Sequence, residues 1–263
     1  MNYLIRILQI GLGSYAIICL ILFFMQEQLI FHPNKLDKNY SFKFKNKFEE
    51  LNMKTADGKL LNGLLFKAEK SKGVIFYLHG NAGSINSWGH VSEVYTKLHY
   101  DVFILDYRGY GKSEGSIQSQ DQLFTDNQLV YNYLKKRYNE TNIIVLGYSI
   151  GTGLASKLAS QNQPKQLILQ APYYSLPYLV KHKFPLAPSF ILKYKFNTYQ
   201  YLEDCNMPIT IFHGNLDRII PIESSIKLKS KFKDKIQFIT LENQEHMGIT
   251  FNPYYDKALQ SIL

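Results

Sequence analysis

Cysteine is scarce in this chain of 263 residues, and neither internal repeats nor low-complexity tracts occur. The two cysteines, Cys19 and Cys205, lie in no CxxC or similar metal-ligand spacing. This excludes a disulfide framework and a structural zinc site. Charged residues are 19% of the chain against 46% hydrophobic residues, a balance that excludes a disordered tail or a fibre. The length suits one large globular domain or two small ones.

Acidic residues are outnumbered, with 21 Asp and Glu against 30 Lys and Arg and a formal net charge of +9. This excess favours anionic partners but does not distinguish a lipid surface from a nucleic acid. No nucleic-acid recognition motif accompanies the charge, so no nucleic-acid partner is expected.

A long uncharged run, residues 7–25, lies near the N-terminus. As a helix it would extend about 28 Å, close to the roughly 30 Å hydrocarbon core of a bilayer. A cleaved signal peptide is the alternative, but no A-x-A-like site follows the run. Residues 1–28 are therefore predicted to be a single-pass membrane anchor. Lysines after the run outnumber the single Arg6 before it, which favours a cytoplasmic domain but leaves the orientation open.

Beyond a polar linker at residues 29–47, apolar segments alternate with helix-length segments. Strands are predicted at residues 59–67, 73–78, 102–105, 143–146, 166–169, 209–212 and 237–241. Helix-length segments such as residues 119–138, 151–160 and 222–231 lie between most of them. Continuously apolar strands are typical of strands buried on both faces. The pattern predicts one α/β domain over residues 48–263, a mostly parallel sheet flanked by helices.

The sequence Gly147-Tyr148-Ser149-Ile150-Gly151 lies between a predicted strand and a predicted helix. This is the G-x-S-x-G pattern of a nucleophile elbow in the context that the motif requires. Gly147 and Gly151 allow the close approach of chains around the strained turn that exposes Ser149. The Ile150 N–H, at the helix start, is predicted to stabilise an oxyanion.

A nucleophilic serine needs a base, which in hydrolases of this architecture is a histidine late in the chain. Three histidines follow Ser149. His182 lies between lysines in a predicted cap, and His213 ends an apolar strand, where a structural role is expected. His246 follows the last predicted strand and is therefore the predicted base.

Asp217 is the predicted acid that orients His246. It lies in the loop after the strand at residues 209–212, and Pro221 ends that loop before the next helix. Glu242 and Glu245 are too close to His246 in sequence to come from a separate loop. The other candidates are interpreted as solvated surface: Asp204, Glu223 and Asp234.

The loop after the strand at residues 73–78 has the sequence HGNAG, residues 79–83. Gly80 allows a sharp turn, so the Asn81 N–H is predicted to be the second oxyanion donor. A phosphate-binding loop is the competing interpretation, but no G-K-[ST] sequence follows. His79 is interpreted as bracing the loop. A structural brace is also favoured over substrate binding for Asp106 and Arg108.

The segment at about residues 172–205 is too long for a simple connection and is predicted to be a cap insertion. From residue 171 to 202 it contains four lysines and six tyrosines but no acidic residue. Such a surface suits an anionic lipid interface, while an ordinary insertion with solvated lysines is the alternative.

Five motifs follow one another along the chain: HGNAG (79–83), DYRGYGKS (106–113), GYSIG (147–151), HGNLD (213–217) and EH (245–246). Together they resemble the α/β-hydrolase superfamily, in particular its N-terminally anchored branch of serine-aminopeptidase-like, lysophospholipase-like and depalmitoylase-like enzymes. The resemblance implies the α/β-hydrolase fold with an eight-stranded sheet. It also implies a Ser149–Asp217–His246 triad, Asn81 and Ile150 as oxyanion donors, and no cofactor or metal.

These features predict a membrane-anchored serine hydrolase that cleaves an acyl ester or thioester through an acyl-enzyme intermediate. The expected partners are the acyl substrate, lipids included, and the bilayer. A serine-aminopeptidase-like peptidase and a non-catalytic membrane-bound protein with the same fold are the alternatives. Because a fold does not determine its substrate, the sequence leaves substrate and oligomeric state open.

Overall fold

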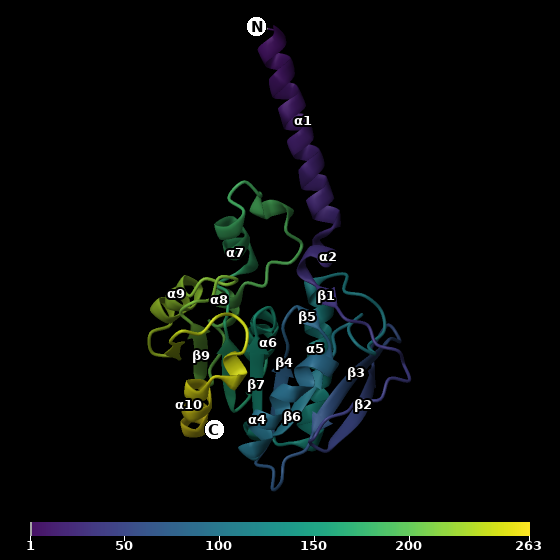
Figure 1. The fold of residues 1–263 in the computed structure, drawn as a ribbon, viewed down its shortest axis with the longest axis vertical. Helices are drawn as coiled ribbons and strands as arrows, with labels where there is room; N and C mark the ends of the chain where they lie inside the picture. The colour runs from purple at the N-terminus through teal and green to yellow at the C-terminus, as the bar shows by residue number, and fades with distance from the viewer. Residues whose placement is uncertain (1) are drawn as a thin grey trace.

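The computed structural model describes residues 2–263, with side chains from residue 3 onward. Helix α1 (Asn2–Phe24) projects from the rest of the molecule, and the short helix α2 (Gln26–Ile30) joins it to the α/β domain (Figure 1). The side chains of α1 are exposed or half-exposed along its whole described length, as expected for a helix that lies outside the protein core.

The domain is built on an eight-stranded sheet in the order β10-β9-β8-β7-β4-β6-β3-β2. The six strands from β10 to β6 in that order are parallel, and β3 and β2 pair antiparallel at one edge. The strands are β2 (Phe48–Lys54), β3 (Leu60–Phe66), β4 (Val74–Leu78), β6 (Asp101–Leu105), β7 (Ile143–Tyr148), β8 (Gln166–Gln170), β9 (Ile209–Gly214) and β10 (Ile236–Leu241). A separate parallel pair joins β1 (His32–Pro33) and β5 (Ala82–Gly83).

Helices cover both faces of the sheet and bury one apolar cluster on each. The helices are α3 (Ile85–Trp88), α4 (Ser92–Lys97), α5 (Gln120–Arg137), α6 (Gly151–Ser160), α7 (Leu176–Lys183), α8 (Thr198–Tyr201), α9 (Glu223–Lys231) and α10 (Pro253–Ile262). Short 3₁₀ turns are η1 (Gly89–Val91), η2 (Glu140–Asn142), η3 (Ser189–Ile191) and η4 (Ile249–Phe251).

Local sequence accounts for the helix ends. The Ser119 and Ser175 hydroxyls accept backbone N–H groups at the starts of α5 and α7. Asn252 does the same for α10, whose first residue is Pro253, a position where proline loses no hydrogen bond.

Two features differ from the sequence-based expectation. Strand β2 is absent from the segments predicted by apolar periodicity, because its sequence FEELNMK is polar and half-exposed at the sheet edge. The predicted polar linker, residues 29–47, packs against the domain. Phe31 and Phe42 are buried in the two apolar clusters, and His32–Pro33 pairs with β5, so this segment is held in place.

Candidate active site

Ser149 lies in the sharp turn between β7 and α6. Its φ of +53° is in the left-handed region, which is strained for a residue with a side chain. The flanking glycines have no room for a Cβ atom: one at Gly147 would lie 2.5 Å from the Gly151 carbonyl oxygen, and one at Gly151 would lie 2.1 Å from the Leu78 carbonyl oxygen. The turn therefore depends on glycine at both predicted positions.

The structure brings Ser149, His246 and Asp217 together in one hydrogen-bonded chain. His246 Nε2 lies 3.0 Å from Ser149 Oγ, and His246 Nδ1 lies 2.7 Å from Asp217 Oδ2. The three residues come from the loops after β7, β9 and β10, at the carboxyl edge of the sheet, and each is no more than 8% exposed. His246 can therefore take the Ser149 proton with little competition from water.

Asp217 is held as an anion. Its Oδ1 accepts the N–H groups of Ile219 and Ile220, each at 2.8 Å. Burial alone would raise the pKa of this carboxyl, but the hydrogen bonds from His213, His246 and the backbone hold it well below its usual range. The carboxylate is thus able to stabilise a positive charge on His246.

His213 has a contact that the sequence did not reveal. Its Nε2 lies 3.2 Å from Asp217 Oδ2 and 2.9 Å from the Ile220 carbonyl oxygen, and its Nδ1 lies 2.6 Å from Ser225 Oγ. The side chain is fully buried, in keeping with the structural role expected for it. The spacing of four residues between His213 and Asp217 could have indicated this contact, because both residues flank one tight turn at the end of β9.

Asn81 and Ile150 line the same cavity as Ser149. Within the described residues, neither backbone N–H donates to another group of the protein. The Asn81 carbonyl accepts the His32 N–H at 2.8 Å and the Tyr110 hydroxyl at 2.6 Å, which fixes the loop. Unengaged N–H groups in the cavity that contains the serine are the donors that an oxyanion site requires.

His79 and Arg108, from two of the other motifs, make structural contacts. His79 is fully buried, with its ring centre 4.2 Å from that of Tyr107. Arg108 binds Asp126 through Nε at 2.6 Å and Asp57 through Nη1 at 2.7 Å. Neither His79 nor Arg108 lines the cavity at Ser149. Across residues 2–263, no group of three His, Cys, Asp or Glu side chains is arranged to hold a metal ion.

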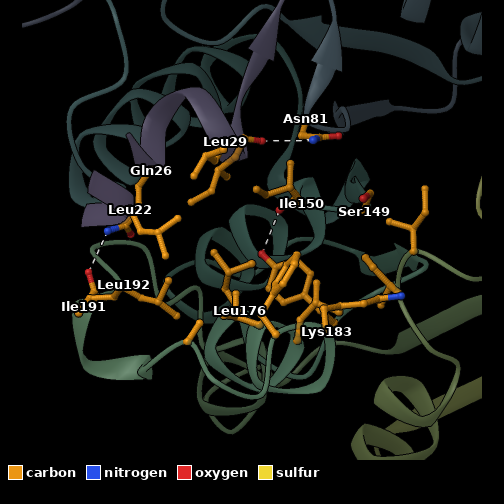
Figure 2. A pocket seen from close by; sticks show the side chains of 18 of the residues that line it. Leu22, Gln26, Leu29, Asn81, Ser149, Ile150, Leu176, Lys183, Ile191 and Leu192 are labelled. Atoms are coloured by element: carbon orange, nitrogen blue, oxygen red, sulfur yellow. Dashed lines mark hydrogen bonds between the residues drawn. The ribbon is translucent and has the colours of Figure 1, made fainter. Parts of the chain in front are cut away.

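A cavity of about 630 Å³ opens onto Ser149. Fourteen of its nineteen lining residues are Ala, Ile, Leu, Phe, Pro or Val. One wall is the cap, including Leu176 and Leu192, and the other includes Leu22 at the end of α1 and Leu29 of α2 (Figure 2). Residues 172–205 were predicted as a cap insertion, whereas the contribution of the N-terminal helices to the cavity was not predicted.

Comparison with known proteins gives consistent matches. The family model described as "Serine aminopeptidase, S33" matches residues 69–201. Uncharacterized protein R595 of Acanthamoeba polyphaga mimivirus is 31% identical over 79% of this chain and 80% of its own length. Protein bem46 of Schizosaccharomyces pombe is 30% identical over 68% of this chain, and Lysophosphatidylserine lipase ABHD12 of Danio rerio is 29% identical over 74%. The chain covers only 63% and 59% of those last two proteins.

Solved structures show the same fold. The esterase Pf2001 of Pyrococcus furiosus matches with a TM-score of 0.72 and 19% identity, covering 89% of this chain and 97% of the esterase. An alpha-beta hydrolase from Vibrio vulnificus matches with a TM-score of 0.69 and 21% identity, covering 82% of this chain and 81% of that protein.

Proposed function

The chain belongs to the α/β-hydrolase superfamily, and on this basis we propose that it is a membrane-anchored serine hydrolase that cleaves an acyl ester or thioester. The observation that carries the proposal is the Ser149–His246–Asp217 hydrogen-bonded chain, which opens into an apolar cavity. An acid-oriented histidine beside a strained serine is the arrangement used for acyl transfer.

In the proposed reaction, His246 Nε2 takes the proton of Ser149 Oγ as this oxygen attacks the substrate carbonyl. The N–H groups of Asn81 and Ile150 stabilise the oxyanion, and ionised Asp217 stabilises the imidazolium. His246 then gives its proton to the leaving alcohol or thiol, which leaves an acyl-enzyme. Water repeats the sequence and releases the carboxylic acid.

The apolar cavity supports an acyl chain as the group that is recognised. The names of the similar proteins, a lysophosphatidylserine lipase and an esterase, agree with an ester or lipid substrate. A peptidase is less well supported despite the family's description. Among the described residues, none that lines the cavity is acidic, so no carboxylate is available there for a peptide's terminal ammonium.

Helix α1 supports the membrane part of the proposal. Residues Tyr3–Phe24 are long and apolar enough to span a bilayer, and none of the span is buried in the protein. A signal sequence near the N-terminus has the same properties. N-terminal sequencing of the protein from alkali-washed membranes distinguishes the two, because an anchor is retained and a signal sequence is removed.

A fluorophosphonate probe tests the proposed chemistry. The full-length protein is expected to be labelled, Ser149→Ala to lose the label, and Ser160→Ala, on the last residue of α6, to keep it. Absence of labelling in folded wild-type protein contradicts the proposal. A series of p-nitrophenyl esters of increasing chain length, with matched thioesters and an aminopeptidase substrate, then defines the substrate class; we expect long-chain esters to be preferred.

A further inference from the structure

The N-terminal helices are attached to the cap by specific polar contacts. Gln26, only 4% exposed, donates from Nε2 to the Ile191 carbonyl oxygen at 2.8 Å and accepts the Lys193 N–H at 2.8 Å. Lys193 Nζ also lies 3.2 Å from the Glu27 carboxylate. These contacts attach the chain just after α1 to the cap. They lie at Gln26 and Glu27, and Glu27 is the first charged residue after the apolar run.

The cap loop, residues 184–191, continues from this junction alongside α1 (Figure 1). The Tyr15 hydroxyl donates to the Leu186 carbonyl oxygen at 3.0 Å. Tyr15 precedes Phe24, the last residue of α1, by nine residues, or about 14 Å of helix. One leaflet contributes about 15 Å of hydrocarbon, so a bilayer spanned by α1 would also contain the cap loop.

The side chains of the cap loop suit that environment. Leu186 and Phe190 are each 85% exposed, and Phe184 is also largely exposed. Large apolar side chains gathered on an exposed loop mark a binding surface. The segment around them, residues 171–202, has four lysines and no acidic residue. No negatively charged side chain in it would therefore repel an anionic headgroup layer.

The cavity continues from this loop to Ser149. Leu22, Leu29 and Ile191 line it on the side of the anchor and cap loop, and Ser149 lies on the opposite side (Figure 2). A lipid acyl chain that enters the cavity from the side lined by Leu22 and Ile191 would therefore pass a mostly apolar lining before it reaches Ser149.

We propose that the cap loop inserts into the phospholipid leaflet that surrounds the end of α1, and that a lipid with a single acyl chain passes from this leaflet into the cavity. The anchor is then one wall of the substrate site as well as a tether. The substrate part of the inference rests on the proposed hydrolase function, whereas the insertion of the loop does not.

Insertion is tested by fluorescence of the full-length protein in phosphatidylcholine vesicles. The chain has one tryptophan, Trp88, so Trp88→Phe combined with Phe190→Trp places a single reporter on the cap loop. Lipids brominated on their acyl chains are expected to quench this reporter. They should not quench the control, Trp88→Phe with Tyr254→Trp, because Tyr254 is exposed on α10, at the opposite end of the molecule from α1 (Figure 1). No quenching at position 190, or equal quenching of both reporters, overturns the inference.

The route of the substrate is tested with Leu186→Ser/Phe190→Ser, since neither residue lines the cavity. The kcat/KM for lysophosphatidylcholine in phosphatidylcholine vesicles is expected to fall by about tenfold or more, because binding to the leaflet scales with buried apolar area. Hydrolysis of soluble p-nitrophenyl butyrate should not change. Equal effects on both substrates, or no effect on either, overturn the route.

If wild-type protein hydrolyses neither substrate and resists the fluorophosphonate, the proposed function fails, while the quenching result still decides insertion.

Discussion

Asp217 contacts two histidines, and its charge matters most when His246 carries the proton of Ser149. Asp217→Asn replaces an acceptor by an amide that favours the wrong tautomer of His246. We expect a folded protein whose turnover falls roughly 10²–10⁴-fold. Steady-state kinetics should show a larger effect on kcat than on KM.

The matched control is Glu242→Gln, since this carboxylate is hydrogen-bonded to Asn215 and lies outside the Ser149–His246–Asp217 chain. Its turnover should stay close to that of the wild type. Near-normal turnover of Asp217→Asn together with an inactive Glu242→Gln would show that the acid is wrongly assigned.

The unfolding free energy is expected to depend on pH through Asp106. It is fully buried, its Oδ1 accepts the Ile85 N–H at 2.8 Å, and burial raises its pKa to about 8. An unfolded Asp titrates near 4, so between about pH 4 and pH 8 the folded protein keeps a proton that the unfolded chain loses. Stability from this group therefore falls as the pH rises through that window.

Asp106→Asn removes this titration. From pH 6.5 to 8.5 the wild type should lose on the order of 2 kcal/mol more unfolding free energy than the variant. Thermal unfolding at the two pH values measures the difference, and Asp234→Asn, at an exposed position, should retain the wild-type slope. Identical slopes for wild type and Asp106→Asn would mean that Asp106 is ionised in the folded protein.

At the scale of elements, Arg108 connects the loop after β6 to α5 and to the turn between β2 and β3. Arg108→Met leaves Asp126 buried without its cation, which is expected to cost about 3–5 kcal/mol of unfolding free energy. Fluorophosphonate labelling of the folded fraction should persist.

The control is Arg137→Met, which removes a surface pair with Glu49 and should cost less than about 1 kcal/mol of unfolding free energy. A stable Arg108→Met protein that is not labelled would favour the alternative role in substrate binding.

Helix α2 forms part of the cavity, so a substitution in it is expected to change the preference for the length of the substrate's acyl chain. Leu29→Trp places an indole in the space proposed for the acyl chain. The ratio of long-chain to short-chain p-nitrophenyl ester hydrolysis is expected to fall, because a longer chain needs more of the cavity. Ile226→Trp, at an exposed apolar position of α9 outside the cavity, should not alter it. An unchanged ratio in Leu29→Trp would place the acyl chain elsewhere.

Local pattern was sufficient for most of the fold. The buried strands are continuously apolar, so they stand out in the sequence, whereas β2 mixes charged and apolar residues at a sheet edge and does not. Motif positions placed Ser149, Asp217 and His246 in loops after predicted strands, and in the structure they lie within hydrogen-bonding distance. The junction between α2 and the cap could not be predicted this way, because Gln26 and Ile191 are 165 residues apart.

At the scale of the whole molecule, α1 and the cap helix α7 lie at one end, and α10 lies at the other (Figure 1). Residues of α1, α2 and the cap line the cavity at Ser149. This arrangement places the proposed catalytic residues near the proposed membrane surface. A chain that takes its substrate from a leaflet needs the anchor, the cavity and the nucleophile at the same end of the molecule.

Mass spectrometry of the acyl-enzyme shows whether Ser149 is the nucleophile. Full-length protein is mixed with a long-chain p-nitrophenyl ester, quenched in acid during turnover and digested with trypsin. We predict one added acyl group on the peptide of residues 138–157, attached to Ser149 and absent from Ser149→Ala. Turnover without an adduct, or an acyl group on another residue such as Cys205, would contradict an acyl-enzyme at Ser149.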